Sequence, residues 1–339
     1  MKRYKTIILS MLCVLSLTGC GHKGTSGAKK DGDLLGAQTS GQNGSGLTSA
    51  GEIPEEEIFL SKEEALAQIG LTESPKTVVA TTYAAAELLD KVGSNLVGVP
   101  EEYAKDHKEY EKYAVIGTEE QIDYEALKTI EADLYVFDGA KREEIEPNLA
   151  ELKLPTYFTN LHYVNTVYTC IQILGITCGD EEKMKEVFYQ YLDDQQKALV
   201  VANGKAAQNA LLLMVDESGV YMGDASCYFG DMITKIGAIN ISYLLDESVT
   251  EGKKGYLPVN VDAIVATNPQ VIFIENRGVA DPIAQIQGAF GEQWDSMLPV
   301  INNDIHYLDD TFKRGGLDNA NYLQKLADIV YGDQPVVVQ

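Results

Sequence analysis

Basic residues are scarce in this chain of 339 residues. Lys and Arg total 27 against 51 Asp and Glu, the formal charge is −24, and no stretch of the sequence forms a basic stripe. Such a surface repels polyanions, so we expect no nucleic-acid partner. The content of 45% hydrophobic and 23% charged residues is typical of a globular protein of about two domains.

Long apolar runs are also missing. The best candidate for a membrane-spanning segment is residues 6–18, which are too few to cross a hydrocarbon layer of about 30 Å as a helix. This excludes a multi-pass membrane protein. Lys2, Arg3 and Lys5 precede this run, and small residues before Cys20 end it. We therefore predict an export signal over residues 1–19.

The end of this signal, Leu17-Thr18-Gly19-Cys20, resembles the bacterial lipobox, in which cleavage precedes the cysteine and its thiol is acylated. Acyl chains contribute about 0.8 kcal/mol per buried CH₂, so Cys20 is the expected lipid anchor on the extracytoplasmic side of the cell membrane. An ordinary signal peptide with a chance cysteine is the alternative. Residues 20–52, rich in Gly, then form a lipidated cysteine and a flexible tether.

Cysteine is equally sparse, with 5 in the chain. Once Cys13 leaves with the signal and Cys20 is lipidated, Cys170, Cys178 and Cys227 remain, without C-x-x-C spacing, so a zinc site is not expected. Cys170 and Cys178 could pair in an oxidising compartment. The apolar, helix-like stretch between them favours two buried thiols instead.

Signatures of common enzymes are absent. The chain contains no G-x-S-x-G, H-E-x-x-H or G-x-x-x-x-G-K motif, and no G-x-G-x-x-G at a strand-to-helix turn. Its 4 scattered histidines argue against a metal-ion site. A pair of glycosidase carboxylates stays open among 51 acids, although nothing singles one out, and adhesion repeats are missing. We therefore do not expect an enzyme or a permanently bound cofactor.

A β-α-β pattern begins at Pro75 and predicts an N-terminal α/β lobe over residues 75–179 with a mostly parallel sheet. Its expected strands are residues 77–82, 95–99, 132–137 and 155–158. Its expected helices are residues 84–92, 124–130, 143–152 and 163–175, the last ended by Gly175.

Residues 180–203 are predicted to form a connecting backbone helix about 34 Å long. The β-α-β pattern then returns in a C-terminal lobe over residues 204–333. Strands are expected at 209–215, 219–222, 271–275 and 305–308, and helices at 231–237, 261–267 and 319–331. The predicted fold class is therefore α/β, with two Rossmann-like lobes joined by one long helix.

This order resembles the substrate-binding lipoproteins of ABC importers for iron siderophores, haem and cobalamin, a class III periplasmic-binding-protein-like family. Several phrases resemble its haem-receptor branch: VATTYAAAELLD at 79–90, NLVGVP at 95–100, VIG at 115–117 before DYEAL at 123–127, and YLP at 256–258 before NPQVI at 268–272. The resemblance covers residues 75–331.

The resemblance implies a ligand cleft between the lobes and a small closure on binding. Loops at the carboxyl ends of parallel strands are where such sheets place ligands. The expected cleft loops are residues 82–83, 118–121, 138–139, 160–163, 221–228, 276–278 and 311–315. From these loops the expected ligand-binding residues are Tyr83, Glu120, His162, Tyr221, Tyr228, Arg277 and Arg314.

The haem-receptor branch supplies iron with a methionine after the Ile-Gly phrase and a histidine after a late C-lobe strand. The corresponding loops, 118–121 and 276–278, contain neither. His162 is the best substitute, and Tyr83 and Tyr228 also qualify, because imidazole or tyrosinate can ligate haem iron. Local hydrogen bonding is the alternative role of His162.

Arginine is rare, and only Arg142, Arg277 and Arg314 follow the signal. Arg277 and Arg314 fall on expected cleft loops, where guanidinium groups suit haem propionates or an anionic ferric siderophore. Balancing nearby acids on the surface is the alternative role of each.

The resemblance implies an extracytoplasmic lipoprotein that captures haem or a ferric siderophore and delivers it to the permease and ATPase of an ABC importer. A cobalamin or corrinoid carrier is the alternative. Related proteins present one acidic residue per lobe to permease arginines, and Glu125 and Asp262 fall at these positions. Simple exposure of both carboxylates to water is the alternative.

Overall fold

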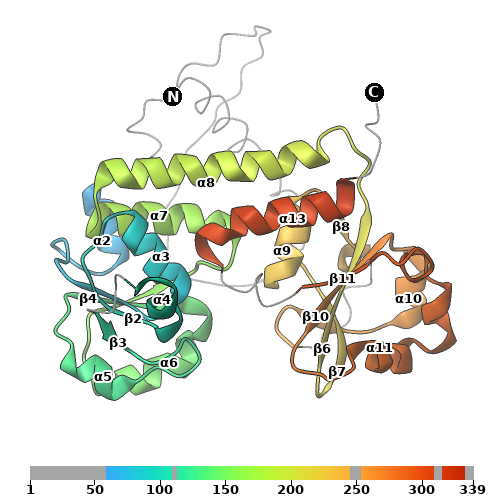
Figure 1. Cartoon of the computed structure of the whole chain (residues 1–339), viewed down its shortest axis with the longest axis horizontal. Coiled ribbons are helices and arrows are strands. Elements are labelled where there is room, and N and C mark those ends of the chain that lie inside the picture. The colour runs from blue at the N-terminus through green and yellow to red at the C-terminus, as the bar shows by residue number, and fades with distance from the viewer. Residues whose placement is uncertain (1–58, 109–112, 245–252, 309–314, 333–339) are drawn as a thin grey trace, which may run out of the picture. The chain divides into compact units, whose positions relative to one another are not determined.

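The computed structural model describes residues 59–108, 113–244, 253–308 and 315–332 (Figure 1). Contacts between Cα atoms group Leu60–Gln339 into one compact unit. The predicted signal, Cys20, the tether and Arg314 lie outside the described residues. No helix within the described residues is long and apolar enough to cross a membrane.

The first sheet is entirely parallel, with the strand order β3-β2-β1-β4-β5. Its central strands are short and apolar, and every residue of β1 is buried, as expected for a parallel sheet covered on both faces. The strands are β1 (Val78–Ala80), β2 (Leu96–Val99), β3 (Ala114–Val115), β4 (Leu134–Asp138) and β5 (Thr156–Thr159).

Helices surround this sheet, and their N-caps are mostly the Ser, Thr and Asp residues that accept backbone N–H bonds well. The helices are α2 (Lys62–Gln68), α3 (Tyr83–Lys91), α4 (Glu101–Asp106), α5 (Tyr124–Thr129), η3 (Gly139–Lys141), α6 (Arg142–Leu149) and α7 (Val164–Cys178). One core of the lobe joins Val79, Ile116, Leu127, Tyr135, Phe137, Ile145 and Leu149.

The second sheet is mixed and has the order β11-β10-β6-β7-β9, with β8 paired to the start of β6. β6, β10 and β11 run parallel, whereas β7 is antiparallel to β6 and to β9. The strands are β6 (Asn209–Asp216), β7 (Gly219–Gly223), β8 (Ile239–Asn240), β9 (Tyr256–Pro258), β10 (Val271–Asn276) and β11 (Ile305–Tyr307).

Both faces of the second sheet bear hydrophobic cores. One contains Phe229, Phe273 and Tyr322, and the other contains Ile264, Ile274 and Trp294. The covering helices are α9 (Tyr228–Lys235), η4 (Ile241–Leu244), α10 (Val261–Ala266), α11 (Pro282–Phe290), η5 (Gly291–Ser296), α12 (Leu298–Ile301) and α13 (Asn319–Tyr331). The short helix η7 (Gly316–Asp318) precedes α13 and contacts α3 and α7 of the first lobe.

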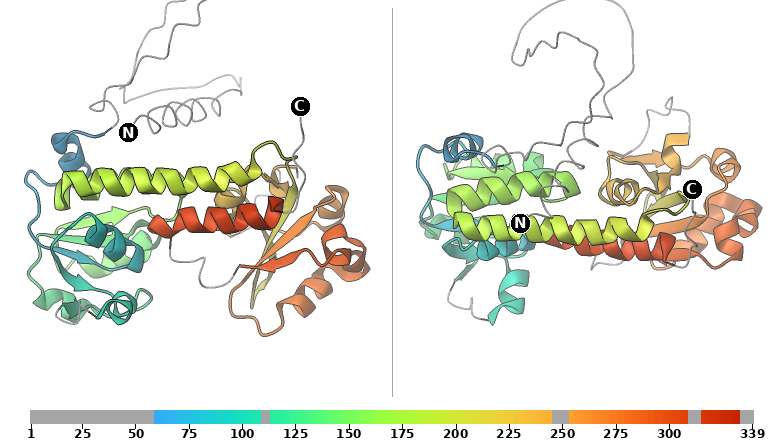
Figure 2. Two further views of the ribbon diagram at one scale, coloured as in Figure 1. Left: turned by 45° about the horizontal axis from the view of Figure 1, so that its top comes forward. Right: turned by 90° about the horizontal axis from the view of Figure 1, so that it is seen from above.

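The long helix α8 (Glu181–Ala202) connects the two sheets in sequence and packs along both α7 and α13 (Figures 1 and 2). Asp180 caps it by accepting a hydrogen bond from the Lys183 backbone N–H. Two α/β lobes and one connecting helix therefore confirm the predicted fold class.

Three predicted helix limits were wrong by three residues. The helix expected at 143–152 ends at Leu149, as α6. Gly175 does not end its helix but lies buried inside α7, where its lack of a side chain admits Met184 of α8; a Cβ at position 175 would lie 2.2 Å from Met184 Cγ. α9 begins at Tyr228 instead of position 231, because Cys227 already has the extended conformation of an N-cap.

The structure also settles the cysteine question among the described residues. Cys170, Cys178 and Cys227 are free thiols. Cys170 and Cys178 lie eight residues apart on one helix, a rise of about 12 Å, which is too far for a disulfide. Burial raises the pKa of both thiols to about 11.

Candidate functional site

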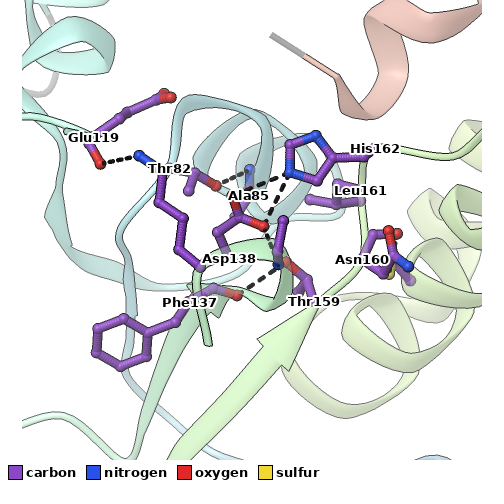
Figure 3. Close-up of polar contacts among 12 residues, drawn as sticks. Thr82, Ala85, Glu119, Phe137, Asp138, Thr159, Asn160, Leu161 and His162 are labelled. Atoms are coloured by element: carbon purple, nitrogen blue, oxygen red, sulfur yellow. Dashed lines mark hydrogen bonds and ion pairs between the residues drawn. The ribbon is translucent and has the colours of Figure 1, made fainter. Parts of the chain in front are cut away.

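The carboxyl ends of β4 and β5 bring a histidine and a carboxylate together (Figure 3). Asp138 is the last residue of β4, and His162 follows β5 by three residues. His162 Nε2 lies 3.0 Å from Asp138 Oδ1 and 3.1 Å from Oδ2. Asp138 Oδ1 also accepts a hydrogen bond of 2.9 Å from the Ala140 backbone N–H. The loop predicted to bind ligand therefore presents a fixed imidazole.

Burial and charge act in opposite directions on this pair. Burial alone would raise the pKa of Asp138, but the hydrogen bond and charge of His162 outweigh it and leave the pKa lowered. Burial likewise disfavours protonation of His162, yet the hydrogen bond and charge of Asp138, with Glu119 nearby, raise its pKa. Each partner thus stabilises the charged form of the other.

Glu119 lies beside this pair, where its side chain contacts the first residue of α3. Its carboxylate accepts a hydrogen bond from the backbone N–H of Tyr83, the first residue of that helix. Burial raises the pKa of Glu119, and that N–H bond partly offsets the increase. The predicted residue Glu120 instead points to solvent, where it pairs with Lys141 Nζ at 2.8 Å. The Tyr83 hydroxyl donates to Asp106 Oδ2 at 3.2 Å.

Tyr228 reaches the same place from the other lobe. Its ring meets the His162 ring edge-on, with centroids 6.1 Å apart. The Tyr228 hydroxyl donates to Asn319 Oδ1 at 2.8 Å, and Asn319 Nδ2 donates to the His162 carbonyl at 3.1 Å and to the Leu161 carbonyl at 3.3 Å. Asn319 is fully buried. One amide therefore joins α9 and α13 to the loop that contains His162.

Arg277 belongs to a second cluster, at the end of β10. Its Nε donates to Glu275 Oε1 at 2.8 Å and its Nη2 donates to the Tyr256 hydroxyl at 2.8 Å. Tyr256 in turn donates to Glu275 Oε2 at 2.7 Å. Glu275 is only 5% exposed, so part of the Arg277 charge compensates a buried carboxylate.

Tyr221 lies in a third cluster, at the turn between β6 and β7. Its hydroxyl and Ser218 Oγ are 2.9 Å apart, and Lys253 Nζ lies 4.5 Å from the centre of its ring. Lys253 also forms an ion pair with Asp216. Hydrogen bonds from Lys253 and Ser218 lower the pKa of Asp216 to about 2.

The two acids expected to dock a permease occupy equivalent positions in the lobes. Glu125 is the second residue of α5 after its cap Asp123, and Asp262 is the second residue of α10 after its cap Asn260. Both are exposed. Glu125 forms an ion pair with Lys128 at 2.5 Å, and Asp262 accepts a hydrogen bond of 2.7 Å from Gln293. Both contacts lie on the exposed surface.

The structure thus brings His162 and Tyr228 together. Tyr83 bonds the nearby Glu119 only through its backbone N–H, and its ring packs against Tyr103. Arg277 and Tyr221 form separate clusters, and the hydrogen bonds described for them stay within the C-terminal lobe. Sequence reasoning missed Asn319, because an asparagine at a helix start is usually a cap and nothing local indicates contacts with residues 157 positions earlier.

Comparisons with known proteins agree with this architecture. The profile of the family described as Periplasmic binding protein matches residues 78–310. The high-affinity heme uptake system protein IsdE of Staphylococcus aureus strain MRSA252 is 21% identical over an alignment of 283 residues that covers 82% of this chain and 94% of IsdE.

Solved structures share the fold. An ABC transporter substrate-binding protein from Listeria monocytogenes EGD-e has a TM-score of 0.64 at 21% identity and covers 77% of this chain and 100% of its own. S. aureus SirA complexed with staphyloferrin B has a TM-score of 0.56 at 19% identity, with coverage of 77% and 93%. The chain therefore belongs to the periplasmic binding protein family, whose members are substrate-binding proteins of ABC transporters and not enzymes.

Proposed function

We propose that this protein captures an iron complex, haem or a ferric siderophore, between its lobes and delivers it to the permease and ATPase of an ABC importer. The observation that carries the proposal is the imidazole of His162, which Asp138 holds at the carboxyl end of β5, opposite Tyr228 from the second lobe. Relatives named for heme uptake and for a complex with staphyloferrin B support the iron-complex class.

Haem fits this site better than a free metal ion does. The described residues contain no group of three or more His, Cys, Asp or Glu side chains that could hold an ion. Haem iron already has four porphyrin nitrogens and needs only axial ligands, for which one imidazole suffices. His162 is the proposed axial ligand, the aromatic ring of Tyr228 would contact the porphyrin, and Tyr83 would line the site at the start of α3.

Arg277 supports the proposal that the ligand carries an anionic group. Its Nε donates to Glu275 and its Nη2 donates to Tyr256, but Nη1 donates no hydrogen bond to another of the described residues. This nitrogen carries two N–H donors that can bind a carboxylate such as a haem propionate. Tyr221, Glu120 and Arg314 complete the proposed set of ligand contacts.

The same proposal assigns the rest of the chain. Residues 1–19 are an export signal, Cys20 carries the lipid, and residues 20–52 tether lobes at 75–179 and 204–333, joined by the helix at 180–203. The protein would act outside the cytoplasm, anchored to the cell membrane. Labelling of cells with a clickable fatty acid should mark the wild type, whereas Cys20→Ala should remain unlabelled.

Delivery is proposed to use Glu125 and Asp262. The double variant Glu125→Lys/Asp262→Lys should bind ligand with unchanged affinity but support markedly less uptake in cells. Glu63→Lys is the matched control, because Glu63 is also an exposed second residue of a capped helix. Unchanged uptake in the double variant would remove the docking role.

Haemin titration of the purified protein, followed by its Soret absorbance, tests the ligand. We expect a saturable shift at one equivalent, which His162→Ala weakens and His306→Ala leaves intact. His306 is a matched control because it also pairs with a carboxylate, Asp304 Oδ1, at 2.6 Å. A ferric siderophore panel and cobalamin serve as competitors, and binding of cobalamin alone would overturn the iron-complex assignment.

A further inference from the structure

Two pairs of a histidine and an aspartate, at the ends of β4 and β5 and at β11, differ in construction. In the pair at β11, His306 and Asp304 are near neighbours in sequence and only one carboxylate oxygen is in contact. In the other, Asp138 and His162 come from the ends of two adjacent parallel strands, and both oxygens face Nε2. Tertiary structure, not local sequence, creates this second pair.

The hydrogen bonds of Asp138 select one tautomer of His162. An ionised carboxylate only accepts hydrogen bonds, so Nε2 must carry the proton that it donates. In neutral imidazole the lone pair then resides on Nδ1. Figure 3 shows Nδ1 on the ring edge that faces away from Asp138.

The imidazole is fixed on several sides but open at Nδ1. Asp138 holds Nε2, Asn319 binds the backbone carbonyl of His162, and the ring of Tyr228 stands against the ring edge-on. None of the hydrogen bonds among the described residues involves Nδ1, and 34% of the side chain is exposed. Asp138 is 13% exposed, so water competes little for its oxygens. The result is a preoriented nitrogen donor.

We propose that Asp138 is a positioning residue that holds His162 so that Nδ1 ligates the iron of bound haem. The inference rests on the proposed function and makes haem the substrate class. Metal-bound histidines in proteins commonly donate their other N–H to a carboxylate, which fixes the ring and makes it a stronger donor. A stronger donor stabilises ferric iron more than ferrous iron, so Asp138 lowers the reduction potential of the bound haem.

The test compares full-chain wild type, Asp138→Asn, Asp138→Glu and His162→Ala, each loaded with one equivalent of haemin. Asparagine keeps the size of the side chain but is a weaker, neutral acceptor. We expect Asp138→Asn to bind ferric haem about 10–100-fold more weakly and with a more positive reduction potential. Asp138→Glu, which keeps the carboxylate, should restore part of both properties. Asp304→Asn is the matched control and should change neither.

The visible and electron paramagnetic resonance spectra add a readout that loss of structure would not mimic. Wild type should show nitrogen ligation that His162→Ala loses, and Asp138→Asn should keep that ligation with altered g-values. In the double variant Asp138→Asn/His162→Ala, the potential should equal that of His162→Ala, because Asp138 acts through the imidazole. An additional shift in the double variant would overturn the positioning role.

Failures of the two proposals are distinguishable. If the wild type binds a ferric siderophore but not haemin, the capture of an iron complex stands and the role of Asp138 is refuted. If haemin binds with the same spectrum and potential in wild type and Asp138→Asn, the role of Asp138 is refuted alone. If neither haemin nor any ferric siderophore binds, both proposals are refuted.

Discussion

Replacement of Gly175 by alanine tests how tightly α7 and α8 are packed. Gly175 is buried in the interior of α7, and a Cβ there would lie 2.2 Å from Cγ and 2.5 Å from Cβ of Met184. Unstrained carbon atoms approach to about 3.5–4.0 Å. Because Met184 is completely buried, it has no exposed space into which it can turn.

Two opposing effects set the magnitude. Overpacking of a core costs about 1–3 kcal/mol, whereas Gly→Ala inside a helix gains about 0.5–1 kcal/mol. The clash at Gly175 is severe, so we expect a net loss of about 2 kcal/mol in the free energy of unfolding. Gly288→Ala is the control, because Gly288 lies in α11 with nothing within 4 Å of an added Cβ. It should stabilise the protein by about 0.5–1 kcal/mol.

The free energy of unfolding is measured by urea denaturation of Gly175→Ala, Met184→Ala and the double variant Gly175→Ala/Met184→Ala, with Gly288→Ala as the control. Met184→Ala alone should cost about 2–5 kcal/mol, and its smaller side chain leaves room for the new methyl group. The double variant should therefore be at least about 1 kcal/mol more stable than the sum of the single losses predicts. Additive losses within about 0.5 kcal/mol, or stabilisation by Gly175→Ala alone, would refute the packing argument.

Two further variants examine polar contacts by the same denaturation method. Asn319→Ala removes three hydrogen bonds of a fully buried side chain and should cost about 2–3 kcal/mol. Asn321→Ala, at an exposed position of the same helix, should change the stability by no more than about 0.5 kcal/mol, and equal losses in the two variants would contradict this account. Asp216→Asn removes a carboxylate whose pKa hydrogen bonds lower to about 2. The variant should be about 1 kcal/mol less stable than the wild type at any pH above about 4, the pKa of the unfolded carboxyl, and this difference should disappear as the pH falls towards 2. A difference that does not depend on pH would refute this reasoning.

Local sequence signals predicted much of the fold. The apolar strands β1, β4, β6 and β10 and the helix α8 were located to within a few residues, because each carries a strong hydrophobic pattern and clear end signals. The strands β3 and β8, of two residues each, and β9, which ends in Pro258, were missed, since none of them lies in a sustained apolar run. At Gly175 a helix end was predicted where there is none, because glycine usually ends helices, whereas here it lets α7 pack closely against Met184 of α8.

The candidate site was predictable only in outline. The rule that loops at the carboxyl ends of strands bear ligands selected residues 160–163, and the structure places His162 of this loop beside Asp138. The partners of each side chain depend on tertiary contacts, which explains why Glu275 was not foreseen beside Arg277 and why Asn319 was not foreseen beside His162.

The contact of Asn319 with the His162 loop has a consequence for the order of synthesis. The first sheet is complete in sequence by Thr159, so its strands can pair while the rest of the chain is still being made. The anchor of the His162 loop, however, arrives 157 residues later, at the start of the last described helix. An unfinished chain would therefore contain the histidine but not the support that orients its loop. If ligand binds at the proposed site, its capture would begin only once the final helix has folded onto the first lobe.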